Sequence, residues 1–105
     1  MSFLLLYITC PDESTAFTIS QKMVSSRLSA CANVFPAESI YWWKDVLNKE
    51  DEWIIMLKTS FRLESVIEKA IIELHPAEVP CVTRFESSAS VTYEKWLEES
   101  TSMVK

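Results

Sequence analysis

The residues from Glu73 to Cys81 are the part of this 105-residue chain best suited to chemistry near neutral pH. The segment contains the only histidine, His75, which is followed by Pro76, Pro80 and a cysteine. Proline restricts the residue before it to extended conformations, so this segment is a stiff connector that can present an imidazole. A His-Pro pair just past a helix is also an ordinary helix terminus, and the sequence leaves both interpretations open.

Cys31 is the second residue that could take part in chemistry. A thiolate with His75 and a carboxylate would suit a borderline or soft metal ion, with copper favoured on intrinsic affinity. The sequence has no pair of ligands at helical spacing or in a tight loop, so such a site must be assembled by the fold or between subunits. The alternative is that Cys31 is a small core residue. A Cys31/His75 nucleophile would also need an orienting group and an oxyanion hole, so we expect no enzyme activity.

Three consecutive aromatic residues, Tyr41, Trp42 and Trp43, are the third feature. On a strand they could form a ligand-stacking platform or cleft wall, or an oligomer interface, and we favour the interface because they point to both faces. Stacking of RNA bases would require a basic surface, which this sequence does not provide. Lys58 ends an apolar strand, where we expect it either to pair with Glu78 or to extend its ammonium to the sheet rim.

The composition of the chain argues against several classes of function. Fifteen acidic and ten basic residues give a net charge of -5, which argues against nucleic acid or an anionic membrane surface as a partner. The absence of glycine excludes Gly-rich phosphate loops, and three cysteines without a CxxC pair argue against disulfides and zinc ribbons. The apolar run Phe3 to Ile8 is too short to span a membrane. We therefore expect a cytoplasmic protein without an organic cofactor.

The hydrophobic pattern predicts an alternation of short strands and helices. The expected elements are a strand over 3–10, a helix from its N-cap Asp12 to about Ser29, an extended segment over 33–47, a polar turn over 48–51, a strand over 53–59, a helix capped by Ser60, a strand over 81–86 and a terminal helix from Ser90. This order predicts one α+β domain, residues 1–105, with the ferredoxin-like split βαβ (βαββαβ) arrangement, an antiparallel sheet, a long central hairpin and a C-terminal helix.

The predicted strands are apolar on both faces. In a two-layer domain the helices cover one face of the sheet, so alternate residues on the other face should be polar. In Phe3–Ile8 and Trp53–Leu57, however, successive residues are all apolar. A monomer would expose an apolar patch well beyond the roughly few hundred Å² that soluble proteins tolerate. We therefore expect a second protein surface to cover the open face.

Several segments occur in a distinctive order along the chain. They are Thr9–Glu13 (TCPDE), Arg27–Asn33 (RLSACAN), Ser39–Trp43 (SIYWW), Leu57–Thr59 (LKT), Glu73–Pro80 (ELHPAEVP) and Tyr93–Leu97 (YEKWL). Together they resemble the CutA family of divalent-cation tolerance proteins, and the resemblance spans nearly the whole chain. It implies a tight homotrimer of ferredoxin-like subunits with the sheets inside and the helices outside, which would account for strands that are apolar on both faces.

The resemblance also implies binding of copper or other divalent metal ions and a role in the response to metal ions. Cys31 and His75 match positions implicated in metal binding, and with Glu78 and Cys81 they form our candidate ligand set. Positions expected near a cleft between subunits are Tyr41, Trp43, Lys58 and Glu78. Candidate residues of the trimer interface are Tyr41, Trp42, Trp43 and Trp53. The alternative function is a trimeric small-ligand sensor or protein-anchoring scaffold whose clefts bind a small anion or an unidentified partner protein.

Three departures from the family pattern bear on these expectations. Members commonly have tyrosine where this chain has Ala77, so a phenol is missing from the presumed cleft. They commonly have a carboxylate where this chain has Cys81, and a thiol would favour copper over calcium or magnesium. Asp45 stands where members commonly have glycine, and we expect it to be tolerated at a turn because Asp visits left-handed conformations more readily than most residues.

Overall fold

The structure, a computed structural model, describes residues 2–102 of the chain. Its elements are β1 (Phe3–Cys10), α1 (Glu13–Ser25), β2 (Cys31–Trp43), β3 (Val46–Thr59), a short 3-10 helix (Phe61–Leu63), α2 (Glu64–Leu74), β4 (Val82–Ser87) and α3 (Val91–Thr101). The strands form one antiparallel sheet in the order β2-β3-β1-β4, which confirms the predicted ferredoxin-like α+β arrangement. Within residues 2–102, no helix is both long and apolar enough to cross a membrane.

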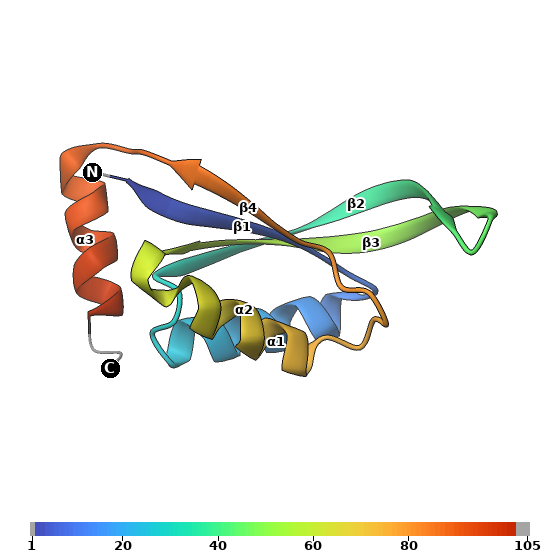
Figure 1. Ribbon diagram of the computed structural model, residues 1–105, viewed down its shortest axis with the longest axis horizontal. Helices are drawn as coiled ribbons and strands as arrows, with labels where there is room; N and C mark the ends of the chain where they lie inside the picture. Colours follow the sequence, from blue (N-terminus) through green and yellow to red (C-terminus); the bar gives the residue numbers. More distant parts are fainter. Residues whose placement is uncertain (1, 103–105) are drawn as a thin grey trace.

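Helices α1 and α2 lie side by side on the same face of the sheet (Figure 1). Alternate residues of β1 and β3, among them Leu6 and Leu57, point to this face and are fully buried together with Ile19 of α1 and Ile67 of α2. Burial of each such side chain stabilises the fold by about 1.5–3 kcal/mol relative to exposure. This layer of apolar side chains is the main core, and both helices contribute to it together with the sheet.

The start of α1 is confirmed and its end differs from the prediction. Asp12 is the N-cap and accepts a hydrogen bond of 2.7 Å from the backbone N–H of Thr15. The helix ends at Ser25 rather than near Ser29, because Arg27 adopts a left-handed conformation with φ of 62°. The following N–H, that of Leu28, then bonds to the carbonyl of Met23 over 3.0 Å. Glycine is the usual residue at the left-handed position that ends a helix in this way, and here that residue is an arginine.

The central hairpin is longer than predicted and turns earlier. Strands β2 and β3 pair without a bulge from Cys31 opposite Lys58 to Trp43 opposite Val46. Lys44 and Asp45 form the turn, with φ of 47° and 62°, values typical of a two-residue hairpin loop. The predicted turn over 48–51 was wrong, because those polar residues lie on β3 where the strand borders solvent.

The central hairpin extends beyond the rest of the sheet. Beyond the pair Cys10–Trp53 the sheet loses β1, so residues 37–52 form a two-stranded projection, here called the hairpin arm (Figure 1).

The sheet face opposite α1 and α2 carries apolar side chains from all four strands and is here called the open face. Its residues are Leu5, Tyr7, Phe35, Met56 and Phe85. Phe35 and Phe85 are 38% and 48% exposed, which confirms strands with two apolar faces.

The left-handed turn yields a stability prediction. Asp45→Gly removes the steric cost of positive φ and should raise the free energy of unfolding by about 0.5–1 kcal/mol. Asp51→Gly, at an exposed extended position of β3, is the matched control and should lower it by a similar amount. Urea unfolding at one fixed chain concentration measures both. Destabilisation by Asp45→Gly equal to that of Asp51→Gly would contradict the turn at 44–45.

Candidate functional site

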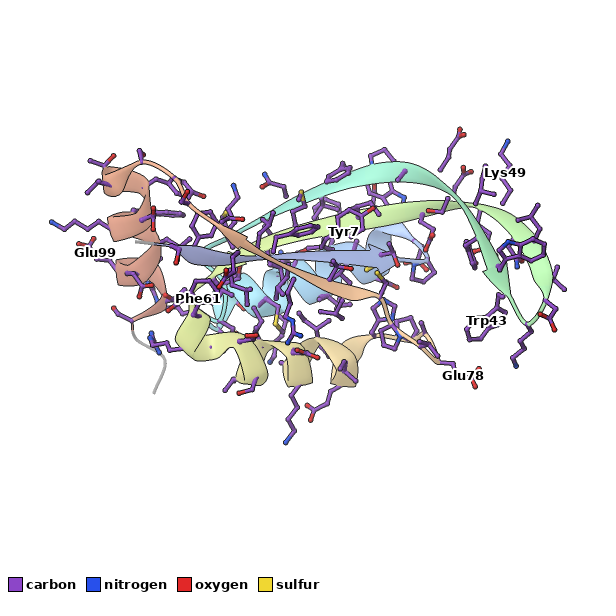
Figure 2. All side chains as sticks on the ribbon, turned by 45° about the horizontal axis from the view of Figure 1, so that its top comes forward. Tyr7, Trp43, Lys49, Phe61, Glu78 and Glu99 are labelled. Atoms are coloured by element: carbon purple, nitrogen blue, oxygen red, sulfur yellow. The ribbon has the colours of Figure 1, made fainter. Side chains whose placement is uncertain are left out.

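A cavity of about 850 Å³ lies between the hairpin arm and the loop that follows α2. One wall is the arm, with Tyr41 and Trp43 from β2 and Glu50 and Glu52 from β3. The other wall is the loop over residues 75–81, here called the His75 loop. Figure 2 shows Trp43 and Glu78 at this same end of the molecule, one from each wall. The cavity therefore gathers most of the residues to which the sequence assigned a function.

His75 fastens the His75 loop to the sheet. Its Nε2 lies 2.7 Å from the backbone carbonyl oxygen of Thr9, at the end of β1. The backbone N–H of Ala77 donates to Nδ1 over 3.1 Å, so Nε2 is the nitrogen that carries the proton and donates to Thr9. Both ring nitrogens thus have partners within the chain, and only 9% of the residue is exposed. The imidazole serves as a structural bridge here, and a metal at Nδ1 would have to replace the Ala77 N–H.

The carboxylates of β3 give the cavity a negative potential. Glu50 accepts a hydrogen bond from the Tyr41 phenol, and this bond, with the nearby charges of Glu50 and Glu52, raises the pKa of Tyr41 above its ordinary value. Burial raises the pKa of the Cys10 thiol to about 11, with further contributions from Asp12 and Glu52. The raised pKa of Cys10 is thus due mainly to burial, and that of Tyr41 mainly to its hydrogen bond with Glu50.

Glu78 and Lys58 do not form the predicted pair within one chain. Glu78 instead meets Lys44 of the arm, with 3.9 Å between its Oε2 and the lysine Nζ, and both side chains are more than two-thirds exposed. Such a pair contributes little to stability. Lys58 lies at the other end of the sheet, with its Nζ 5.4 Å from the ring centroid of Tyr93. The prediction that paired Lys58 with Glu78 was therefore wrong for a single chain, and Lys58 does not line this cavity.

The four candidate metal ligands do not meet within one chain. His75, Glu78 and Cys81 line the cavity, whereas Cys31 lies at the α3 end of the sheet with its Sγ 3.5 Å from the Tyr93 hydroxyl. Across residues 2–102, no cluster of three or more His, Cys, Asp or Glu side chains could hold a metal ion. A single subunit therefore does not fit the copper site expected from these four residues.

The aromatic residues predicted at an interface face different surroundings. Tyr41 and Trp43 point into the cavity, and Trp42, on the opposite face of the arm, is 68% exposed. Trp53 packs against the main core on the helix-covered face of β3, and its place in a trimer interface stays a prediction. Among these four, Trp42 leaves the largest fraction of its surface free for another protein.

Sequence reasoning missed Glu50 and Glu52 as cavity residues. The pairing of Ser39 with Glu50 and of Ala37 with Glu52 puts these carboxylates on the face of the arm that carries Tyr41. No alternation of polar and apolar residues marks this stretch as a strand, because all five residues from Asn48 to Glu52 are polar. That composition is typical of a turn, and the turn was accordingly placed at 48–51.

The sequence and the fold both match one known protein family. The family model described as CutA1 divalent ion tolerance protein matches residues 4–100. The chain belongs to this family. It is 36% identical over 98 residues to the divalent-cation tolerance protein CutA of Thermotoga maritima, with 92% of this chain and 97% of that protein covered. The resemblance inferred from the sequence motifs is thereby confirmed.

Solved structures of CutA1 proteins have the same fold. The crystal structure of CutA1 from Pyrococcus horikoshii aligns with a TM-score of 0.90 at 32% identity and covers 93% of this chain and 97% of that one. CutA1 from Ehrlichia chaffeensis aligns with a TM-score of 0.89 at 31% identity, with 94% of each chain covered. The long hairpin and the terminal α3 lie within the span of this likeness.

Proposed function

We propose that this CutA1 protein is a non-enzymatic, trimeric divalent-cation tolerance protein. Contact between copies of the chain covers its bare apolar surfaces and completes its metal site. The open face is the observation that carries the proposal, because α1 and α2 leave it bare and α3 covers only its end near Phe3. A patch of this kind marks a protein interface. The cysteines at positions 10, 31 and 81 are all free thiols, which favours a reducing compartment, and we propose the cytoplasm.

The hairpin arm supports the same proposal. A two-stranded ribbon is at most marginally stable in water unless something packs against it. The arm nevertheless exposes large apolar side chains on both of its faces. They are Ile40, Trp42, Val46 and Leu47, each at least 58% exposed. Packing of each arm on a neighbouring copy would bury these residues together with the open face, and a closed ring of three leaves none of the arms without a partner.

A copper or other divalent ion site would then draw on more than one subunit. Cys31 lies at the α3 end of the sheet, while His75, Glu78 and Cys81 lie at the arm end. Contact between copies would bring the α3 end of one sheet to the arm end of another. A set of thiols with an imidazole suits copper. Cys81 strengthens this preference, because its exposed thiol replaces the hard carboxylate that relatives commonly carry.

The trimer is tested by light scattering on the purified protein at micromolar concentration. We expect the mass of three chains of 12.1 kDa each. Phe85→Glu introduces a charge on the open face and should shift the mass towards one chain. Val66→Glu on α2 is the matched control, because Val66 is 50% exposed on the outer helix layer, and it should leave the mass unchanged. A wild-type mass of one chain, or equal dissociation by both variants, would contradict the trimer.

Copper binding is tested by anaerobic Cu(I) titration of the wild-type protein and its variants. Cys31→Ala and His75→Ala should each weaken copper binding about tenfold or more, since each removes one ligand. Cys10→Ala is the control, because burial keeps that thiol protonated with a pKa of about 11. Circular dichroism establishes that each variant is folded. Unchanged affinity in both the Cys31 and His75 variants would contradict the ligand set.

A further inference from the structure

Helix α3 stands across the end of the sheet and is separate from the main core (Figure 1). No residue of α3 that the structure describes belongs to that core. The helix packs instead on a second, smaller cluster of buried residues, which are Phe3, Ala30 and Leu97. An isolated helix of 11 residues is marginal in water, so α3 depends on this cluster and on the polar contacts that hold it.

Two arginines from outside α3 hold its C-terminal end. The Arg27 guanidinium donates to the backbone carbonyl oxygen of Ser100 over 3.0 Å. The Arg62 guanidinium donates to the next carbonyl oxygen, that of Thr101. The last turn of α3 has no basic residue of its own and carries Glu99, although the C-terminal end of a helix is the negative end of its dipole. Both arginines therefore compensate a charge that the sequence of α3 leaves unbalanced.

Arg27 makes its contact from a costly backbone conformation. Its φ of 62° is left-handed, a region in which glycine is the residue without a steric cost. An arginine in such a conformation points to a role for its side chain. That side chain bonds to a residue 73 positions further along the chain, so it links the loop after α1 to the end of α3.

The docked α3 covers part of Cys31 at the start of β2. The Tyr93 hydroxyl lies 3.5 Å from the Cys31 Sγ, and this thiol is only partly exposed. Glu94 is a weak point of the docking, because it is 4% exposed and its Oε1 has no hydrogen-bond partner among residues 2–102. A buried carboxylate oxygen without a partner is unfavourable, and this penalty is relieved when the helix leaves the sheet.

We propose that α3 is a cover over Cys31 that opens as a unit, and that Arg27 and Arg62 form its latch. Opening breaks the small cluster and the contact between Tyr93 and Cys31, while the main core stays intact. Access of an alkylating reagent, an oxidant or a metal ion to this thiol is then controlled by the latch instead of by global unfolding. Each of these contacts lies within one chain, so the proposed trimer neither supplies nor replaces them. The inference holds whether or not Cys31 binds copper.

The three cysteines of the full-length protein report on this opening when iodoacetamide labelling is followed by mass spectrometry. The reagent is kept dilute, so that α3 closes faster than the thiol reacts. Cys81 is exposed and should react first, whereas Cys10, which is fully buried in the main core, should react only on global unfolding. Cys31 should react at a rate between the two. This rate should not depend on chain concentration, because the cover and the thiol belong to the same chain.

Variants of the latch should expose Cys31 more often. At one fixed chain concentration, Arg27→Met and Arg62→Met should each raise its labelling rate about tenfold, the effect of one lost hydrogen bond from a charged group. Lys22→Met is the matched control, because it makes the same change in net charge at an exposed position of α1. It should leave the labelling rate of Cys31 unchanged.

A variant of the main core separates local from global opening. Ile67→Val removes one buried methyl group from that core and should raise the labelling rate of Cys10 several-fold. It should leave the rate of Cys31 unchanged, because the main core remains packed when α3 opens. An equal increase at both thiols would contradict the local opening.

Arg27→Gly separates the backbone strain from the latch. It removes the guanidinium and also relieves the positive φ, which the loop keeps when α3 opens. Cys31 should therefore be labelled as fast as in Arg27→Met. Cys10 should be labelled several-fold more slowly than in Arg27→Met, because relief of the strain stabilises the fold against global unfolding.

Three further outcomes would overturn the proposal. They are equal labelling rates of Cys31 and Cys10 in the wild-type protein, a Cys31 rate that falls as the chain concentration rises, and Cys31 rates in Arg27→Met and Arg62→Met no higher than in Lys22→Met. The first two are measured on the unmodified protein, so they remain decisive even if a variant fails to fold.

Discussion

The uninterrupted pairing of β2 with β3 determines which face of the hairpin arm each side chain occupies. It runs from Cys31 opposite Lys58 to Trp43 opposite Val46, without a bulge. Side chains alternate between faces along a strand, so a shift of one residue would move every one of them to the other face. In the observed register Tyr41 and Glu50 share the cavity face, while the next residues along each strand point away. The cavity and the bare apolar surfaces of the arm are both consequences of this register.

A second interaction gives the cavity its other wall. The two hydrogen bonds of the His75 ring hold the His75 loop against the end of β1, at the point where the arm leaves the sheet. A buried imidazole with both nitrogens satisfied contributes to stability and would be costly to disturb. A copper ion at His75 would have to compete with the Ala77 N–H, so the proposed metal binding would disturb the side chain that shapes the cavity.

Most of the fold could be predicted from the sequence, because apolar periodicity and capping residues such as Asp12 act locally. The errors lie where a backbone conformation usually signalled by glycine is adopted by another residue. Arg27 ends α1, and Lys44 with Asp45 turns the hairpin, all at positive φ. In a chain without glycine, Arg27 and Lys44 carry no local signal, whereas the turn expected at Asp45 from the family resemblance is confirmed. The displaced turn then concealed Glu50 and Glu52, because a polar strand that borders a cavity resembles a loop in composition.

Only the part of the candidate site that is close in sequence could be predicted. His75, Glu78 and Cys81 are close in sequence, so their shared loop was evident, and Tyr41 and Trp43 were recognised as a possible cleft wall. Cys31 and Lys58 lie at the α3 end of the sheet, so their membership of these sets stays a prediction about contact between subunits. Distances between strands depend on register and length, which residue types alone do not determine.

The titration of Tyr41 reports whether the hairpin register turns the β3 carboxylates onto the aromatic wall of the cavity. Tyrosine Cζ shifts followed by NMR against pH, with Tyr41→Phe for assignment, report this pKa in the wild-type protein and in Glu50→Gln. We predict a pKa for Tyr41 above the ordinary tyrosine value, because the phenol donates to a carboxylate. It should fall towards that value when the Glu50 charge is removed. An ordinary pKa that Glu50→Gln leaves unchanged would contradict the register and, with it, the acidic cavity.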